Sequence, residues 1–196
     1  MTYLFVDTSH FLHIGLLNED LEWLESEVLE LKKTSELLHE KIKHLLERYD
    51  LETSQLSGLI TIAGPGSYTG MRVGEGLAQV FELAEIATYS FYSSEIPKIL
   101  GISDYRWCFP AFKSEYYIRT IDSEQLVSRD DFYELSSSDK LNMITHGINE
   151  ISQYCSQDTR SMLRDNPVEI FTHVINNNLR ELPYYFRPLD VEFKKS

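Results

Sequence analysis

The amino-acid sequence predicts an α/β fold with a mixed sheet that begins with a hairpin. Two short apolar runs rich in β-forming residues, Thr2–Val6 and Phe11–Leu17, lie on either side of the turn-like residues Asp7, Thr8 and Ser9. A stretch with helical periodicity begins at Ser35, and a glycine-rich loop further on separates an apolar strand from a second helix. Strands alternating with helices are typical of α/β domains.

Length and composition restrict the class of protein. The chain has 196 residues, enough for one substantial domain or two small ones, and 42% of them are hydrophobic, as in globular proteins. No apolar run approaches the length of a membrane span, and the N-terminus has no basic segment of the kind that opens a signal peptide. Cys108 and Cys155 are too few for a disulfide framework. We therefore expect a cytoplasmic protein with no membrane contact.

The charge of the chain argues against extensive direct contact with nucleic acid. It carries 18 basic and 31 acidic residues, a formal net charge of −13. Binding to a nucleic-acid backbone depends on Lys and Arg side chains that neutralise phosphates. If the protein acts in a nucleic-acid pathway, another subunit is expected to make most of those contacts.

The first half of the chain is predicted to alternate strands and helices. Leu21–Lys33 is ambiguous, because its apolar positions fit a helix while Val28–Leu31 alternates as a strand does. The helix from Ser35 places its apolar residues on one face and is expected to end at Asp50. The later elements expected in this half are a helical turn at Leu51–Leu56, a strand at Gly58–Ala63, a helix at Arg72–Ala87, a strand at Thr88–Tyr92 and a helix at Glu95–Leu100.

The second half starts with a change to aromatic and β-branched residues near Asp104. A hairpin is expected there, with its turn near Lys113-Ser114-Glu115. Ser136–Asp139 is expected to cap a helix over Lys140–Met143. Further helices are expected at Asn149–Tyr154 and Pro167–Arg180, and the sequence shows no internal repeat.

The stretch Ala63–Gly76 is the most distinctive in the chain. It contains five of the nine glycines and joins the apolar strand to the second helix. Glycines gather where the backbone takes positive φ or where another group must approach closely, and the following helix offers unpaired N–H groups. The loop is therefore a candidate site for an anion, a nucleotide or a partner chain.

Three known loop motifs do not fit this stretch. A phosphate-binding P-loop needs Lys and then Ser or Thr after its last Gly, but Met71 and Arg72 follow Gly70. The dinucleotide fingerprint needs a third Gly where Thr69 stands. A nucleophile elbow needs Gly on both sides of the Ser, but the residues two positions from Ser67 are Pro65 and Thr69.

The loop instead resembles that of the TsaB (YeaZ) family. The matching residues are Gly64–Gly74, read together with Asp7-Thr8-Ser9 and Ser35-Glu36-Leu37-Leu38. The resemblance covers about the first hundred residues well and the last fifteen loosely, through Pro183–Pro188. Members of this family are catalytically inert relatives of TsaD in the bacterial system that makes threonylcarbamoyladenosine in tRNA.

The resemblance implies an actin-like, hexokinase-like first lobe with a mixed five-stranded sheet, and a reduced second α/β lobe. The implied domains are residues 1–103 for the first lobe, 104–182 for the second and 183–196 for a C-terminal segment that packs back on both. It also implies a strand rather than a helix within Leu21–Lys33, and we adopt the strand there.

The resemblance also implies partners. The helices before and after the glycine loop would pair with a TsaD-type subunit in a heterodimer, a TsaE-type ATPase would be the third component, and the isolated chain would be able to form a homodimer. ATP and metal would be bound by the partner subunits, and tRNA would be reached mainly through the complex. The implied partner-binding residues are Ser35, Glu36, His39, Glu40, Gly70, Arg72 and Gly74.

Two further sets of residues are singled out in the first lobe. Gly64, Pro65, Gly66, Ser67, Tyr68, Thr69 and Gly70 are expected to form a structural loop. Asp7, Thr8, Ser9 and Arg72 are the candidates for a nucleotide or phosphate site. Asp7 is either a turn cap or a ligand, and Arg72 either meets a phosphate or pairs with a carboxylate such as Glu36.

No catalytic residue and no metal site are predicted. His10 and His13 would point to opposite faces of a strand, His39 and His44 are five apart on a helix, and His146 and His173 are isolated. Ser67 has no evident His partner, and Cys108 lies in an aromatic strand. A non-catalytic subunit is the main interpretation. The alternatives are a glycoprotease-type (M22) metallohydrolase, an actin-like-fold small-molecule kinase and a self-associating scaffold.

Overall fold

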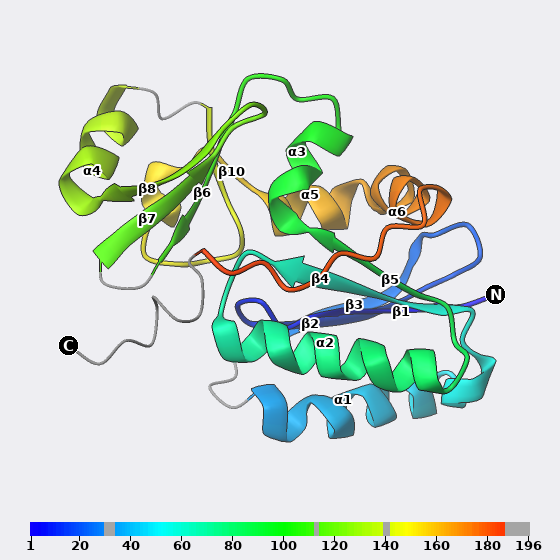
Figure 1. The fold of residues 1–196 in the computed structure, drawn as a ribbon. Helices are drawn as coiled ribbons and strands as arrows, with labels where there is room; N and C mark the ends of the chain where they lie inside the picture. Colours follow the sequence, from blue (N-terminus) through cyan, green and yellow to red (C-terminus); the bar gives the residue numbers. More distant parts are fainter. Residues whose placement is uncertain (30–33, 112–113, 139–141, 187–196) are drawn as a thin grey trace.

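Two five-stranded sheets and their helices form the protein (Figure 1). The computed structural model describes residues 1–29, 34–111, 114–138 and 142–186, and the side chains of residues 34–36 and 138 are not described. The first sheet has the order β3-β2-β1-β4-β5. Its strands are β1 Tyr3–Asp7, β2 Leu12–Leu17, β3 Trp23–Leu29, β4 Gly58–Gly64 and β5 Thr88–Tyr92.

Strand directions in the first sheet are mixed. β1, β2 and β3 form an antiparallel meander, whereas β4 lies parallel to β1, and β5 lies parallel to β4. This confirms the predicted hairpin-first mixed sheet. β3 confirms the strand that the resemblance implied, and the helical periodicity of its segment was misleading. Every second residue of β3, from Leu24 to Val28, is exposed, as expected for an edge strand with one face in water.

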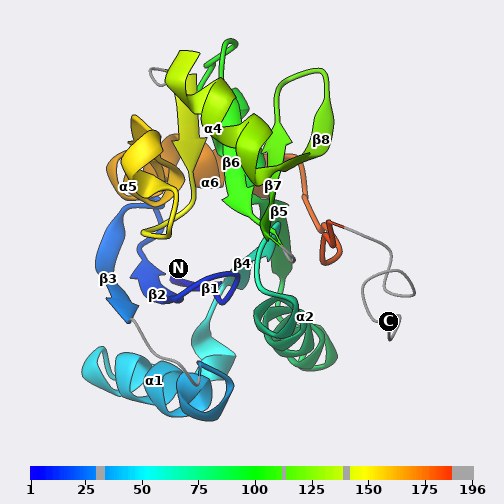
Figure 2. The same ribbon diagram turned by 90° about the vertical axis from the view of Figure 1, so that its left-hand side faces the viewer.

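Helices cover both faces of the first sheet. On one face α1 Thr34–Arg48 and α2 Tyr68–Leu83 pack beside each other, which Figure 2 shows from the side. On the other face lie α3 Ile96–Ile99, α5 Thr159–Asp165 and α6 Pro167–Asn176. Short 3-10 helices occur at Thr53–Gln55, Ser93–Glu95 and Ser152–Tyr154. The core of this lobe is therefore two apolar layers, one on each side of the sheet.

The second sheet repeats the strand order of the first. Its order is β10-β9-β6-β7-β8, with β6, β7 and β8 antiparallel and β9 and β10 parallel to β6. Its strands are β6 Arg106–Pro110, β7 Glu115–Arg119, β8 Glu124–Ser128, β9 Met143–Thr145 and β10 Gln157–Asp158. The two lobes therefore share a topology that no repeat in the sequence reveals.

The main errors of the sequence-based prediction lie in the second lobe. The predicted β6–β7 hairpin is confirmed, but Ser136–Ser138 end helix α4 Arg129–Ser138 instead of starting one. Met143 lies in β9, while residues 139–141 are outside the described residues. The helix starts earlier because Ser128 caps it, its hydroxyl accepting from the N–H of Asp131 at 3.2 Å.

Two other helix predictions need correction. Of Asn149–Tyr154 only the last three residues form a 3-10 helix. α6 ends at Asn176 instead of Arg180, because Asn178 takes a positive φ of 48° that ends the helix. Helix α5 and strand β8 were not predicted.

The predicted domain boundaries at 103 and 182 stay a prediction. α5 and α6 belong to the second segment by sequence, yet Leu163, Phe171 and Val174 pack into the core of the first sheet. Met162 of α5 contacts the cores of both sheets. Among the described residues, no helix combines the length and apolar character that crossing a bilayer requires.

Candidate functional site

The glycine loop is shorter than predicted, because helix α2 begins at Tyr68 and not at Arg72. Ser67 is its N-cap, and the Ser67 hydroxyl accepts from the N–H of Gly70 at 3.4 Å. Tyr68, Thr69 and Gly70 are therefore the first turn of the helix, and the loop proper is Gly64–Ser67. The cap explains how a helix starts among residues of low helix propensity. The helix also ends at Leu83, four residues before the predicted end.

Three glycines bring α2 against the turn after β1. A methyl group added at Gly66 or Gly70 would overlap the main chain of Ser9 or Thr8, and at Gly74 it would lie 2.9 Å from Oγ1 of Thr8. The N–H of Ser67 donates to the Ser9 carbonyl at 2.6 Å, and the Thr8 hydroxyl donates to the Gly70 carbonyl at 2.7 Å. The glycines thus serve a close contact within the chain.

The carboxylate of Asp7 is the centre of a buried polar cluster. Asp7 has no exposed surface, and its Oδ1 accepts from the N–H of Ser9 at 2.7 Å and from the Ser9 hydroxyl at 2.6 Å. Oδ2 accepts from Nε2 of His146 at 2.8 Å and from Arg160 at 3.4 Å. Burial alone would raise the pKa of Asp7, but the charges and hydrogen bonds of these partners outweigh it and hold the pKa well below its usual range.

This interlobe cluster, Asp7, Ser9, His146, Thr159 and Arg160, joins the two lobes. Asp7 ends a strand of the first sheet, while His146 follows β9 of the second and Arg160 lies in α5. Nδ1 of His146 also contacts the hydroxyl of Thr159 at 2.8 Å. Both oxygens of Asp7 are thus engaged by protein groups. Asp7, Thr8 and Ser9 remain a prediction as nucleotide ligands.

Sequence reasoning did not single out His146 and Arg160 as partners of Asp7. They lie 139 and 153 residues from it along the chain, and neither belongs to a motif. The available signal was weak: His146 follows the short apolar run Met143–Ile144 and precedes Gly147. Gly147 has a positive φ of 69°, and an added methyl group there would lie 2.7 Å from Arg160.

His10 and His13, near the first hairpin, lie in different environments. Nε2 of His10 donates to the carbonyl of Ile148 in the second lobe at 2.8 Å. His13 is buried, contacts the hydroxyl of Ser26 at 2.7 Å, and has its pKa lowered to about 4, mainly by burial. No set of three or more His, Cys, Asp or Glu side chains with metal-binding geometry occurs within the described part of the chain.

Arg72 is exposed on the first part of α2. Its guanidinium donates to the hydroxyl of Tyr68 at 3.0 Å and lies 5.5 Å from the centre of that ring. The alternative partner Glu36, like Ser35, is a predicted partner-binding residue whose side chain lies outside the described part of the structure. The contact with Tyr68 is local, so the guanidinium stays on the outer surface of the helix.

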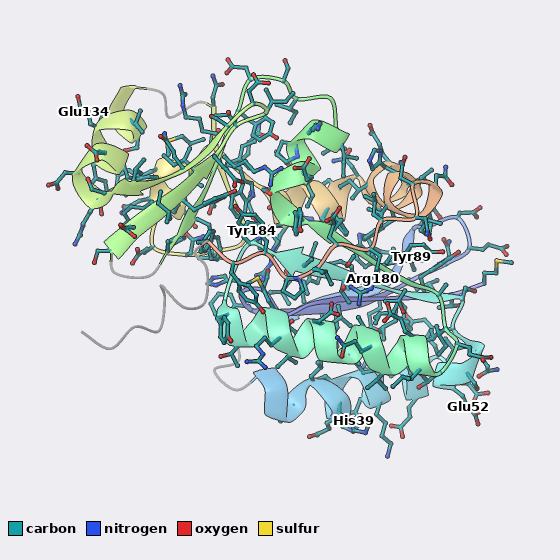
Figure 3. The ribbon with its side chains drawn as sticks, viewed as in Figure 1. His39, Glu52, Tyr89, Glu134, Arg180 and Tyr184 are labelled. Carbon is teal, nitrogen blue, oxygen red and sulfur yellow. The ribbon has the colours of Figure 1, made fainter. Side chains whose placement is uncertain are left out.

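A groove runs between α1 and α2 on the outer side of the molecule. Its volume is about 650 Å³, within the usual range for a binding site, and its walls are mainly apolar. His39 of α1 contributes to it, and Figure 3 shows His39 on the outer edge of the helix. The lining residues are Leu38, His39, Ile42, Lys43, Leu46, Glu47, Leu51, Glu52, Thr53, Val73, Gly76, Leu77, Val80 and Phe81.

The predicted partner-binding residues divide around this groove. His39 lines it and Glu40 is exposed beside it, but Gly70 and Gly74 face the Thr8 turn on the inner side of α2. The groove also includes Gly76, where an added methyl group would meet only open space.

Two large apolar side chains on the exposed side of α2 were not singled out from the sequence. Val80 lines the groove and is 60% exposed, and Leu83 at the end of the helix is 85% exposed. The signal that was missed is the excess of apolar residues in α2 over the number that one buried face of an amphipathic helix needs.

Part of the chain is similar in sequence to a curated bacterial protein. No family profile matches the chain. Over 80 residues it is 39% identical to the tRNA threonylcarbamoyladenosine biosynthesis protein TsaB of Bacillus subtilis. That alignment covers 40% of this chain and 35% of the relative, so it spans about a third of the length of that protein.

Two solved structures share the fold. YeaZ from Pseudomonas aeruginosa superposes with a TM-score of 0.54 at 20% identity, covering 65% of this chain and 68% of that one. A protein described as similar to the peptidase YEAZ from Pseudomonas aeruginosa gives 0.65 at 18% identity, covering 95% and 99%. These matches confirm the predicted α/β fold over nearly the whole chain.

Proposed function

We propose that this chain is a member of the TsaB (YeaZ) family and acts as a non-catalytic subunit in the biosynthesis of threonylcarbamoyladenosine in tRNA. The family assignment is supported by the 39% identity to TsaB from Bacillus subtilis and by the YeaZ fold, which extends over 95% of the chain. The proposed role is to bind a TsaD-type subunit and to support its transfer of the threonylcarbamoyl group to the adenosine next to the anticodon.

The observation that carries this proposal is the groove between α1 and α2. An apolar groove between two helices is a common docking site for helices of a partner protein. Val80, which lines the groove, and Leu83, one turn further along α2, are both exposed apolar side chains. Large apolar side chains exposed together are typical of an interaction site. The glycine contacts with Thr8 and Ser9 fix the start of α2, so the groove is built on a rigid support.

The chemistry of the motif residues favours a supporting role. The Ser67 hydroxyl accepts from the N–H of Gly70 as a helix cap, and both oxygens of Asp7 are held by protein donors. Burial raises the pKa of the Cys108 thiol well above its ordinary value, which disfavours the nucleophilic thiolate. In this proposal ATP and metal are bound by the partner subunits, among them a TsaE-type ATPase.

The acidity of the chain fits a subunit that reaches tRNA mainly through a complex. A net charge of −13 disfavours direct contact with the phosphate backbone. A homodimer formed through the same groove is the competing use of this surface, since the apolar walls would serve a second copy as well as a partner.

The test is to mix the purified chain with a TsaD-type subunit and to measure the mass of the complex by light scattering. We expect a heterodimer, and we expect Val80→Asp to weaken it at least tenfold, because a charge would be buried against apolar walls. Val168→Asp on α6, also at an exposed valine on a helix, is the control and should bind as the wild type does.

Three results would contradict the proposal. The first is a wild-type chain that does not bind the TsaD-type subunit, and the second is equal weakening by both valine variants. The third is threonylcarbamoylation of tRNA, or stoichiometric metal with ATP turnover, by the isolated chain, which would favour the enzyme alternatives. Light scattering of the chain alone shows whether it forms a homodimer. If the second copy and the TsaD-type subunit both bind the groove, adding that subunit should dissociate the homodimer.

A further inference from the structure

The segment after α6, residues 179–186, crosses the molecule from the first lobe to the second. We call it the strap. It continues from α6 along the free edge of β5 and ends beside the second sheet, where Figure 1 shows it as the orange-red trace. The N–H of Ser90 on β5 donates to the Leu179 carbonyl at 2.9 Å, and the N–H of Glu181 donates back to the Ser90 carbonyl at 3.1 Å. The strap is thus bonded to the sheet edge as a short extra strand would be.

Arg180 ties the strap to α2. Its guanidinium donates to the two oxygens of Glu75 at 2.9 Å each and to Oε1 of Glu82 at 2.6 Å. The Arg180 and Glu75 side chains are only 23% and 17% exposed, and Glu82 is 44% exposed. A bidentate Arg–carboxylate pair shielded from water is stronger and better oriented than an ordinary surface ion pair.

The far end of the strap is bonded to both lobes. The N–H of Tyr184 donates to the Ala63 carbonyl at the end of β4, at 2.9 Å. The Tyr184 hydroxyl donates to Glu124 of β8 at 2.7 Å, and the hydroxyl of Tyr117 donates to the other oxygen of Glu124 at 2.6 Å. Figure 3 shows Arg180 over α2 and Tyr184 nearer the second sheet.

The two halves of α2 are held in different ways. The first half is fixed by Gly70 and Gly74 against the Thr8 turn. The later part, from Glu75 to Leu83, has Gly76 and Val80 on the groove side, while Glu75 and Glu82, seven residues apart and so on one face, meet Arg180. The groove-lining half of the helix is therefore held on its flank by the strap.

We infer that the strap positions α2 for docking, with Arg180 as the positioning residue and the Tyr184–Glu124 contact as its anchor on the second lobe. This rests on the proposed function of the groove. It gives the second lobe a part in partner binding without direct contact. Without Arg180, Glu75 would lack its cation in a site that is mostly shielded from water, and the second half of α2 would shift or loosen.

The experiment compares Arg180→Gln, Arg180→Lys and Tyr184→Phe with the control Arg164→Gln, which removes an exposed Arg–Asp pair on α5. Affinity for the TsaD-type subunit is measured by calorimetry well below the melting temperature. Amide hydrogen exchange in residues 75–83 of the chain alone is measured in parallel. Glu82→Gln is the milder substitute if Arg180→Gln does not fold.

We expect Arg180→Gln to weaken binding about tenfold, which corresponds to about 1.4 kcal/mol, and to speed exchange in α2 by a similar factor. Arg180→Lys should recover only part of both, because an ammonium keeps the charge but not the bidentate geometry. Tyr184→Phe should have a smaller effect in the same direction, and Arg164→Gln should have none. The inference is overturned if α2 exchange in Arg180→Gln equals that of the wild type, or if affinity is unchanged while exchange rises. Failure of the proposed function is a separate result, because then the wild type itself does not bind.

Discussion

The two sheets of this protein share one strand order but differ in the connection after the fourth strand. In the first sheet β4 leads into the glycine loop and the sixteen-residue helix α2 before β5. In the second, β9 leads through His146, Gly147 and one 3-10 turn to β10, with no such helix between them. The first lobe consequently has a groove between two helices. In the second lobe the corresponding connection, after β9, instead carries His146, which bonds Asp7 of the first lobe.

This difference shows how one topology supports two roles. Helix α2, which follows the fourth strand, lies on the sheet beside α1, and the groove lies between these two helices. A short connection leaves the end of the strand free, so that His146 reaches Asp7 of the other lobe. If the two connections have these different roles, substitutions in them should have different effects on the free energy of unfolding and on the coupling of the two lobes.

The largest effect is expected when the interlobe cluster is broken. Asp7→Ala removes the carboxylate that the buried His146 and Arg160 share, and loss of one partner of a buried ion pair costs about 3–5 kcal/mol. Urea unfolding followed by tryptophan fluorescence measures the change in the free energy of unfolding, and it can be followed for each lobe separately. Trp23 lies in the first sheet and Trp107 in the second, so Trp107→Phe and Trp23→Phe chains each report on one lobe.

Both tryptophans should report one midpoint in the wild type and different midpoints in Asp7→Ala. Ser9→Ala is the control, since it removes one hydroxyl donor and should cost about 1–2 kcal/mol. Equal costs for the two variants, or separate midpoints already in the wild type, would mean that Asp7 does not hold the lobes together.

Acid should act first on the sheet of the first lobe, through His13. Its folded pKa of about 4 is below the unfolded value of about 6.5, so the unfolded chain takes up a proton that the folded chain does not bind. The stability due to neutral His13 is complete above pH 6.5 and declines as pH falls to about 4, by about 3 kcal/mol. Asp7 has a lowered pKa too, but its contribution is lost only below about pH 4.

Urea midpoints of the wild type and of His13→Gln between pH 7 and 4 test this assignment. The variant should show a flatter dependence over that interval, although His10 should still contribute in the same direction, because burial lowers its pKa too. The same slope in both chains would assign the acid sensitivity to other groups.

The glycines of α2 should respond in opposite directions. Gly70→Ala would place a methyl group against the Thr8 carbonyl, and overpacking of this kind costs about 1–3 kcal/mol. Gly76→Ala meets open space in the groove and should add about 1 kcal/mol of stability through helix propensity. Thermal unfolding by circular dichroism measures both. Destabilisation by Gly76→Ala would mean that the groove side of α2 has no open space at Gly76.

The smallest effects are expected at the helix caps after the two loops. Ser67 caps α2 through one weak contact at 3.4 Å, so Ser67→Ala should cost about 0.5 kcal/mol. Asp158 accepts from the N–H of Arg160 at 3.1 Å and of Gly147 at 2.6 Å, so Asp158→Ala should cost about 2 kcal/mol. If the order is reversed in chemical denaturation, the second-lobe connection is not the more tightly held of the two.

The first lobe could be predicted well from the sequence because its signals are local. The run before Asp7, the amphipathic pattern after Ser35 and the Gly64–Gly76 stretch each depend on residue types and spacing. The start of α2 was predicted too late, because the Ser67 cap begins the helix among residues of low helix propensity. The edge strand Trp23–Leu29 also has a helical period, and only the family resemblance favoured the strand there. In the second lobe the short strand β10 and the seven-residue helix α5 offered too few residues to show a period.

The sequence by itself determined the hairpin, the glycine turn and the family resemblance, since these depend on contiguous residues. Only the tertiary structure decided that Asp7 meets His146 and Arg160, that Arg180 binds Glu75 and Glu82, and that Val80 lines a groove. Such contacts arise where strands and helices far apart in the chain come together, and neither charge nor periodicity along one segment specifies its partner across the fold.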